Sequence, residues 1–581
     1  MYRFLAAAPS LVVAGLLSFL AGCGAGVRPP AGGATVAPVG VGGAGATSVL
    51  PPAAAIRLPH PTAPRPPELS AAFHRERREA LRRLLPPRSV AVLLAAPPRL
   101  LAADVDYPFH QDPNFFYLTG LREPSAVVLL FAEPQPSPLA GGPPVTELLY
   151  VRPRDPFDEL WNGARLGPAG AARALGFGVA LPVADFVQHP PAALARAERV
   201  CWLLPTPGED GRDTPDDSTE LPDLRRAFER AIRLPPTFAP ERVRALALLR
   251  KLAVAYPARP ARWFGGFVEA APAILAEPGL RAWRATAETD TARRHLLATR
   301  FLAALPAPGR FDLTTLEEAL AQLREIKQPE ELALLRYAIG ATVAGHREAI
   351  RAMTADQSED VLDGIQQLVF RQYGCRADGY WPIVGAGANG CVLHYIDNHA
   401  PRAGADLVVM DVGATYGGYT ADVTRTAPAD GTFSPEQRLI YNLVLRAQQA
   451  GIAECRAGRE FVAPGRAAQK IIGEGLVALG IIAVADSAER YFPHGTSHYL
   501  GLDVHDPGTY GPLRPGAVIT VEPGVYIPPD SPCDRKWWGI GCRIEDDILI
   551  TTGDPENLSA GVPREAGEVE RLVAEPSALE P

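Results

Sequence analysis

Three histidines lie close together in one short stretch of the sequence. His494, His498 and His505 are three of the chain's eleven histidines, and they fall within twelve positions among glycine and apolar residues. A single histidine is more often a structural hydrogen-bonding residue than a ligand. Imidazole is, however, the commonest metal ligand and the side chain that titrates closest to neutral pH. This concentration of histidines therefore favours a site for metal binding or proton transfer.

Two aspartates flank a predicted β-hairpin. Residues 406–426 carry strand-forming residues on both sides of a Tyr-Gly-Gly tripeptide, which predicts a tight turn. A turn centred on residues 416 and 417 places Asp411 opposite Asp422, with Cβ atoms about 4.5–5.5 Å apart. Two ionised carboxylates at that distance repel unless a cation lies between them. A lone aspartate here would usually be a solvated turn residue, but Asp411 lies in an apolar run where an unpaired charge is costly.

Two glutamates have similar surroundings. Glu522 follows the apolar run 518–521, and Glu545 lies in a second strand-like segment. Arg543 is two positions before Glu545, so in a strand the two share a face and the guanidinium can hold neighbouring carboxylates. Four carboxylates and one imidazole form a hard, oxygen-rich donor set, which suits Mn²⁺ and allows Co²⁺, Zn²⁺ or Fe²⁺.

The acidic residues and one histidine resemble a known ligand set. In order and local motif they match the five metal ligands of the pita-bread metallopeptidases of family M24: Asp411, Asp422, His498, Glu522 and Glu545. Residues 494–506 resemble the signature of the aminopeptidase P and prolidase branch. Residues 103–120 and 159–167 resemble the N-terminal domain of bacterial aminopeptidase P. The resemblance implies an α/β N-terminal domain followed by an α+β pita-bread (creatinase/aminopeptidase) catalytic domain.

The resemblance also implies a reaction. A Xaa-Pro aminopeptidase releases the N-terminal residue of a peptide whose second residue is proline. The resemblance favours two Mn²⁺ ions bridged by Asp422 and Glu545. Asp411 would complete the ligands of one ion, and His498 with Glu522 would complete those of the other. Two ions about 3.5–4 Å apart lower the pKa of a bridging water and polarise a carbonyl, so a bridging hydroxide is the expected nucleophile.

Residues around the metals receive roles by the same resemblance. Glu522 is expected to move the proton of the water. His394 and His505 are expected to stabilise the developing oxyanion and to help deliver a proton to the leaving nitrogen. His494 is expected to line the proline side of the pocket, and Arg543 to orient carboxylates.

The substrate pocket is expected to involve aromatic residues. Tyr380 and Tyr526 are candidate pocket walls, with plain core aromatics as the equal alternative. Trp161 and Asp104 are expected to border a pocket across a subunit interface, which implies a homo-oligomer, a dimer or tetramer. An X-Pro bond lacks an N–H and its ring fixes the direction of the chain, so a dedicated pocket is needed.

The first residues resemble a bacterial lipoprotein signal peptide. Residues 1–23 contain a short basic start, an apolar run too short for a membrane span, and Leu-Ala-Gly-Cys ending at Cys23, which would be lipidated. An ordinary signal peptide or an uncleaved anchor is the alternative. Residues 24–66 are rich in Gly, Ala and Pro and are expected to form a flexible linker. This implies a bacterial cell-envelope protein facing the periplasm, with membrane contact only through the lipid.

A chain of 581 residues predicts more than one domain. We expect the N-terminal domain at 67–324, with an insertion of unassigned role at 205–310, and the catalytic domain at 325–575. Residue patterns predict a helix at 71–85 and strands at 89–96, 126–131 and 147–151. Pro329 followed by acidic residues predicts the first turn of a long helix that runs to about residue 352.

Charge and motif content exclude other classes. A net charge of −8 without a basic run argues against a nucleic-acid partner. No CxxC motif is present, and Cys533 and Cys542 could close a small disulfide loop in an exported protein. A prolidase shares the five ligands, but residues 107–120 favour aminopeptidase P. Creatinase-type hydrolases and metal-free binding relatives lack ligands that this chain has.

Overall fold

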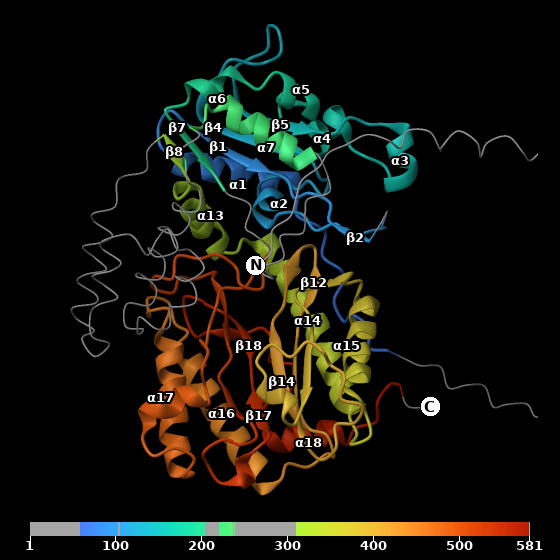
Figure 1. Cartoon of the computed structure of the whole chain (residues 1–581), viewed down its shortest axis with the longest axis vertical. Helices are drawn as coiled ribbons and strands as arrows, with labels where there is room; N and C mark the ends of the chain where they lie inside the picture. Colours follow the sequence, from blue (N-terminus) through green and yellow to red (C-terminus); the bar gives the residue numbers. More distant parts are fainter. Residues whose placement is uncertain (1–57, 103–104, 204–219, 236–237, 239–309, 580–581) are drawn as a thin grey trace, which may run out of the picture. The chain divides into compact units, whose positions relative to one another are not determined.

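The computed structural model describes residues 58–102, 105–203, 220–235, 238 and 310–579 (Figure 1). The expected signal peptide with Cys23, the residue Asp104 and most of the expected insertion lie outside the described residues. Within the described ranges, no helix combines the length and apolar character needed to cross a bilayer. The six described cysteines are unpaired, so Cys533 and Cys542 form no disulfide.

The N-terminal domain is a mixed six-stranded sheet with helices, as the sequence predicts. Strand order is β6-β5-β4-β1-β7-β8; β1 is antiparallel to β4 and parallel to β7. The strands are β1 (Ser89–Leu94), β4 (Val127–Gln135), β5 (Val145–Val151), β6 (Ala180–Pro182), β7 (Arg199–Trp202) and β8 (Phe311–Asp312), with a separate pair β2 (Leu100–Ala102) and β3 (Val105–Asp106). The helices are α1 (Ala71–Leu84), α2 (Pro113–Thr119), α3 (Pro156–Asn162), α4 (Gly167–Leu175), α5 (Val183–Gln188), α6 (Ala192–Arg196), α7 (Glu220–Ala231) and α13 (Thr315–Glu325).

The catalytic domain begins with α14 (Pro329–Arg351). Pro329 occupies the first turn and the Gln328 and Glu331 side chains form a capping box, so the helix begins where the sequence predicts. The other helices are α15 (Glu359–Tyr373), α16 (Pro435–Ala453), α17 (Ala463–Ala478) and α18 (Ala566–Val573). The strands are β9 (Ala377–Asp378), β10 (Ile383–Ala386), β11 (Leu407–Val412), β12 (Ala414–Tyr416), β13 (Tyr419–Thr420), β14 (Val423–Pro428), β15 (Val518–Val521), β16 (Gly524–Ile527), β17 (Ile540–Arg543), β18 (Asp546–Leu549) and β19 (Glu556–Asn557).

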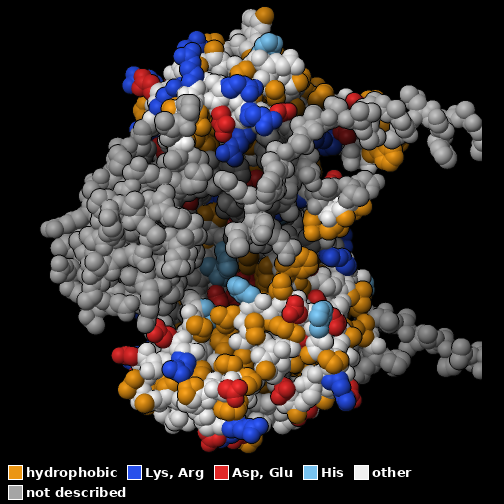
Figure 2. Space-filling view, viewed as in Figure 1, with side chains coloured by type: hydrophobic (Ala, Val, Ile, Leu, Met, Phe, Trp, Pro, Cys, Tyr) orange, Lys and Arg blue, Asp and Glu red, His pale blue; other side chains and the backbone are white. Residues whose placement is uncertain are grey.

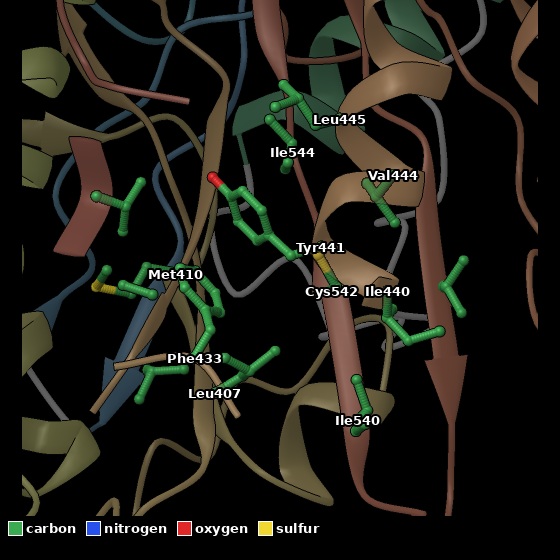
Figure 3. Close-up of a cluster of buried hydrophobic side chains, with 14 of the residues drawn as sticks. Leu407, Met410, Phe433, Ile440, Tyr441, Val444, Leu445, Ile540, Cys542 and Ile544 are labelled. Carbon is green, nitrogen blue, oxygen red and sulfur yellow. The ribbon is translucent and has the colours of Figure 1, made fainter. Parts of the chain in front are cut away.

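The catalytic domain consists of two halves of similar composition. Helices α14 and α15 with the sheet β10-β11-β14 form the first half, and α16 and α17 with the paired strands β15-β18 and β16-β17 form the second. Figure 1 shows one helix pair on each side of the strands. Apolar side chains from α16, such as Tyr441 and Val444, meet Met410 of β11 and Cys542 of β17 in a buried cluster (Figure 3). This packing fixes strands from both halves against one another.

The hairpin of β12 and β13 has a different register from the one predicted. The turn is centred on Gly417 and Gly418, both of which have positive φ, 62° and 96°. Paired residues are Tyr416 with Tyr419, and further along Asp411 pairs with Thr424 rather than with Asp422. A two-residue turn with positive φ at both positions strongly favours glycine, which Tyr416 cannot replace. The prediction of direct pairing was therefore wrong by two residues, a shift that keeps both aspartates on one face of the ladder.

Residues 58–66, at the end of the expected linker, contact the catalytic domain. The side chain of Gln372 hydrogen-bonds the ring of His60 at 2.8 Å, and Tyr373 donates to the carbonyl of His60 at 3.3 Å. Tyr416 donates from its hydroxyl to the carbonyl of Pro66 at 3.2 Å. The expected linker therefore meets the folded domain before residue 66.

The buried His74 on α1 is predicted to make the folding stability of the N-terminal domain depend on pH. Burial, which outweighs the hydrogen bond from Nδ1 to the Tyr117 carbonyl, lowers the pKa of His74 to about 4. Between that value and the unfolded value near 6.5, the unfolded chain binds more protons than the folded one, so stability falls as pH falls. The full loss is on the order of 3 kcal/mol. We expect His74→Gln, which cannot titrate, to show a smaller drop in thermal midpoint between pH 7 and pH 4.5 than the parent. Equal drops would contradict this.

Candidate metal centre

Three predicted ligands meet at the junction of the two halves. Asp422, His498 and Glu545 each offer an atom within 4.8 Å of the others. Asp422 immediately precedes β14, and Glu545 lies between β17 and β18. Backbone and side-chain bonds hold these segments together: Glu545 donates from its N–H to the Thr424 carbonyl at 3.1 Å, and Thr424 donates to the Glu545 carboxylate at 2.6 Å. The geometry brings together residues more than 120 positions apart.

Asp411 is connected to this group by the hydroxyl of Tyr380, and Arg543 holds its second carboxylate oxygen. The hydroxyl of Tyr380 lies 2.5 Å from Asp411 Oδ1 and 2.6 Å from Asp422 Oδ1. Arg543 donates from its guanidinium to Asp411 Oδ2 at 2.6 Å. Arg543 therefore holds a carboxylate, as the sequence predicts. The hydroxyl of Tyr380 is therefore within hydrogen-bonding distance of two carboxylates, a role that the sequence did not predict.

His498 supplies the test of whether these residues fit a cation. Its Nδ1 lies 3.1 Å from the Tyr499 carbonyl, which fixes the proton on Nδ1 in the neutral ring. The lone pair of Nε2 then points at carboxylate oxygens of Asp422, 3.2 Å away, and Glu522, 3.6 Å away. Such contacts are repulsive unless a proton or a metal ion lies between them. The donor set and its geometry fit a divalent cation.

The charges of the site give the same indication. Burial, and then the charges of Asp422, Glu522 and Asp411, hold the pKa of Glu545 well above its usual range. Burial, and then Asp411, raise the pKa of Asp422 to about 6 even though His498 hydrogen-bonds it. Burial opposes protonation of His498, yet the bond and charge of Asp422 raise its pKa to about 9. Carboxylates this crowded are short of positive charge, which bound cations would supply.

Glu522 lies between His498 and His494. His494 Nδ1 is 3.4 Å from Glu522 Oε2, and its Nε2 is 2.8 Å from the hydroxyl of Tyr526. Tyr526 in turn accepts a hydrogen bond from Arg543 at 2.9 Å. Burial raises the pKa of Glu522, but the hydrogen bond from His494 and the nearby positive charges lower it below its usual value. Tyr526 therefore links the predicted proline-side histidine to the arginine that holds Asp411.

Two further predicted histidines reach the surface near the ligands. The ring of His505 meets that of His498 edge-on, with centroids 4.4 Å apart. Displacement of water by the surrounding protein, and then the charges of His498 and His394, lower the pKa of His505 to about 4. Both His394 and His505 are exposed. Figure 2 shows histidine side chains gathered beside acidic and apolar ones on the face in view.

Trp161 does not join the site within the described chain. It lies on α3 and is 74% exposed. The sequence also left several contacting residues unnoticed, among them Thr424, which bonds Glu545, and Asp547, which accepts a bond from the backbone of Asp422 at 3.2 Å. The only sequence signal for these two was their place next to a ligand motif.

Removing the Tyr380 hydroxyl should weaken metal retention. Tyr380→Phe keeps the ring but leaves Asp411 and Asp422 without a shared donor, so the two ligands lose an orienting contact. Such losses typically cost about 10–100-fold in metal affinity or activity. We expect the variant to lose metal at a higher free-metal concentration in a competition titration with a chelator. A titration that coincides with the parent's would contradict the assigned role.

Comparison with known proteins agrees with this geometry. Residues 333–552 match metallopeptidase family M24, and residues 74–202 match the aminopeptidase P N-terminal domain. The Xaa-Pro aminopeptidase of Escherichia coli K12 is 32% identical over 518 residues, which cover 87% of this chain and 98% of that protein. Human Xaa-Pro aminopeptidase 3 is 27% identical over 498 residues, covering 84% of this chain and 81% of that protein.

Solved structures extend the agreement to three dimensions. Aminopeptidase P from E. coli with the inhibitor Pro-Leu has a TM-score of 0.66 at 30% identity, and the match covers 87% of this chain and 99% of that one. An aminopeptidase from Pseudomonas aeruginosa gives 0.67 at 30% identity, covering 87% and 98%. The expected α/β N-terminal domain and pita-bread catalytic domain are confirmed. The chain belongs to the aminopeptidase P family of the M24 metallopeptidases and is a hydrolase of that class.

Proposed function

We propose that the protein removes the first residue from peptides with proline in the second position. In this proposal two divalent metal ions, Mn²⁺ in the first place, are held by Asp411, Asp422, His498, Glu522 and Glu545. The single observation that carries the proposal is the convergence of His498 Nε2 with carboxylates of Asp422 and Glu545 in one cation-sized space. When bound, two such ions supply hydroxide at neutral pH and polarise the carbonyl to be attacked.

The chain's own residues then handle substrate and protons. Glu522, whose pKa is held low, accepts the proton of the attacking water. His505 and His394, which reach the surface beside the ligands, stabilise the developing oxyanion and help return a proton to the leaving nitrogen. Arg543 and Tyr380 hold the carboxylate of Asp411 in place.

The proline ring is expected to lie against His494 and Tyr526. Their rings lie 5.5 Å apart, and the bond between His494 Nε2 and the Tyr526 hydroxyl fixes both orientations. A rigid wall of this kind accepts a ring without needing an N–H from the scissile bond, which proline lacks. This supports specificity for proline after the cleaved bond.

A direct assay tests the proposal. The purified protein, stripped with chelator and refilled with Mn²⁺, Co²⁺ or Zn²⁺, is incubated with a peptide Xaa-Pro-Xaa-Xaa, with its Xaa-Ala counterpart and with an Xaa-Pro dipeptide. We expect two ions per chain and release of the first residue from the longer proline peptide. Fewer than one ion per chain, or no cleavage after refilling, would reject the proposal. Cleavage of the dipeptide alone would indicate a prolidase instead.

We also propose that copies of the chain associate through α3 and that the chain is lipidated at Cys23 in the cell envelope. Phe157, Leu160 and Trp161 of α3 are 73%, 78% and 74% exposed, an apolar surface that a second copy would cover. The lipobox-like sequence ending at Cys23 supports the anchor. Trp161→Glu should lower the mass of the protein measured in solution, and an unchanged mass would reject association through α3. Cys23→Ser should release the protein to the soluble fraction, and an unchanged distribution would reject the lipid anchor.

A further inference from the structure

The junction between the two domains carries three charged side chains that are all buried. Arg324, Glu325 and Lys327 are 2%, 0% and 4% exposed, although Arg324 and Glu325 end α13 and Lys327 lies in the short connection to α14. Buried charges are costly unless fully paired. Their partners are therefore informative.

Two of the three charges meet one aspartate in the histidine-rich segment. Arg324 donates to Asp506 Oδ1 at 2.5 Å, and Lys327 donates to Asp506 Oδ2 at 3.0 Å. Arg324 also donates to Asp503 at 2.7 Å. Asp506 directly follows His505, so its ion pairs with Arg324 and Lys327 hold the chain at the position next to that histidine.

The third charge holds the same segment a few residues later. Glu325 accepts hydrogen bonds from the backbone N–H of Thr509 at 2.8 Å and from its hydroxyl at 2.5 Å. It also accepts one from Arg514 at 2.9 Å. Residues 503–514 are thus held at both ends by residues 324–327, which lie almost two hundred positions earlier in the chain.

The loop that carries His505 is closed tightly around these contacts. Asp506 donates from its N–H to the Tyr499 carbonyl at 2.8 Å, which brings the ends of residues 499–506 together. A Cβ on Gly501 would lie only 2.5 Å from Asp506 Oδ2, so only glycine at this position allows the carboxylate of Asp506 to approach the backbone so closely. The ring of His505 projects from this loop to within 4.4 Å of that of His498, measured between centroids.

The same arginine also contacts helix α2. Arg324 donates from its other terminal nitrogen to Asn114 Oδ1, at the start of α2, at 2.7 Å. One planar guanidinium therefore joins α2, Asp503 and Asp506, a three-way contact that the compact ammonium of lysine cannot reproduce.

We propose that Arg324 is a positioning residue for catalysis, which acts through Asp506 to hold His505 against the metal ligands. The inference rests on the proposed function. A buried cluster of ion pairs rarely stabilises a protein more than apolar packing would. We therefore attribute to this cluster the orientation of the His505 loop rather than a gain in folding stability. Because Arg324 ends α13, a helix of the N-terminal domain, that domain contributes a positioning residue to the catalytic centre.

A double-mutant cycle tests this. Arg324→Gln is expected to lower kcat on the Xaa-Pro peptide about 10–100-fold, with metal content and KM close to those of the parent. In a His505→Ala background the same change should cost less than about twofold, because the group that it positions is absent. Arg324→Lys should recover part of the loss, since its charge can still meet Asp506.

The controls separate positioning from folding and from failure of the proposed function. Asn114→Ala cuts the contact with α2 but leaves Asp506 paired, so its kcat should stay within about threefold of the parent's. If Arg324→Gln does not fold, Arg324→Lys is compared in both backgrounds, with a few-fold loss expected only where His505 is present. Equal losses in both backgrounds, or parental turnover in a folded Arg324→Gln protein, would overturn the inference. A parent that releases no residue would instead reject the proposed function, and the inference with it.

Discussion

Asp422→Asn is expected to lower turnover of an Xaa-Pro peptide roughly a thousandfold or more while leaving the protein folded. The side chain of Asp422 contacts Tyr380 and His498, and its backbone N–H donates to Asp547, so the residue lies at the centre of the ligand cluster. An amide has the same shape but carries no charge and only one acceptor oxygen. It therefore cannot bridge two cations, and elemental analysis should find fewer than two ions per chain.

A matched aspartate provides the control for this variant. Asp363→Asn alters a half-buried carboxylate on α15 that contacts Gln367 and Asn398 rather than the ligands. Its turnover and metal content should stay close to those of the parent. Near-parental turnover in Asp422→Asn, with a thermal midpoint also near the parent's, would contradict the bridging assignment.

His505→Ala is expected to lower kcat about 10²–10³-fold with the metal content unchanged. The His505 ring contacts that of His498 at its edge but is not part of the group of atoms within 4.8 Å that can share a cation. It also reaches the surface, where a substrate carbonyl can meet it. The loss should therefore fall on turnover rather than on the ions themselves.

His399 offers the matched control. It is an exposed histidine whose only charged partner among the described contacts is Asp360, at 3.6 Å. His399→Ala should leave kcat within about twofold of the parent's. Loss of metal in His505→Ala would identify His505 as a ligand, and unchanged kcat would remove it from the mechanism.

Much of the fold could be predicted because local and global signals agree. Pro329 and the acidic residues that follow it predict the start of α14, and the apolar run after Ser89 predicts β1. Charged residues within apolar strands, such as Asp411 and Glu545, indicated the site because an unpaired buried charge is costly.

The details that could not be predicted depend on backbone conformation and distant contacts. The turn at Gly417 and Gly418 requires positive φ at both positions, and a shift of two residues leaves the apolar pattern unchanged, so the pattern could not choose the register. The hydrogen bonds of the Tyr380 hydroxyl with Asp411 and Asp422, and the ion pair of Arg324 with Asp506, join segments far apart in sequence. Sequence spacing contains no information about such contacts.

The division of the catalytic domain into two halves has a consequence for durability. Asp411 and Asp422 belong to the first half, and His498, Glu522 and Glu545 to the second, so resident ions would crosslink the halves in addition to their packing. Opening the domain would then require breaking coordination bonds, which raises the barrier to unfolding. Chelation should shorten the lifetime of the protein in the presence of a protease, well before any change is seen in its helix content.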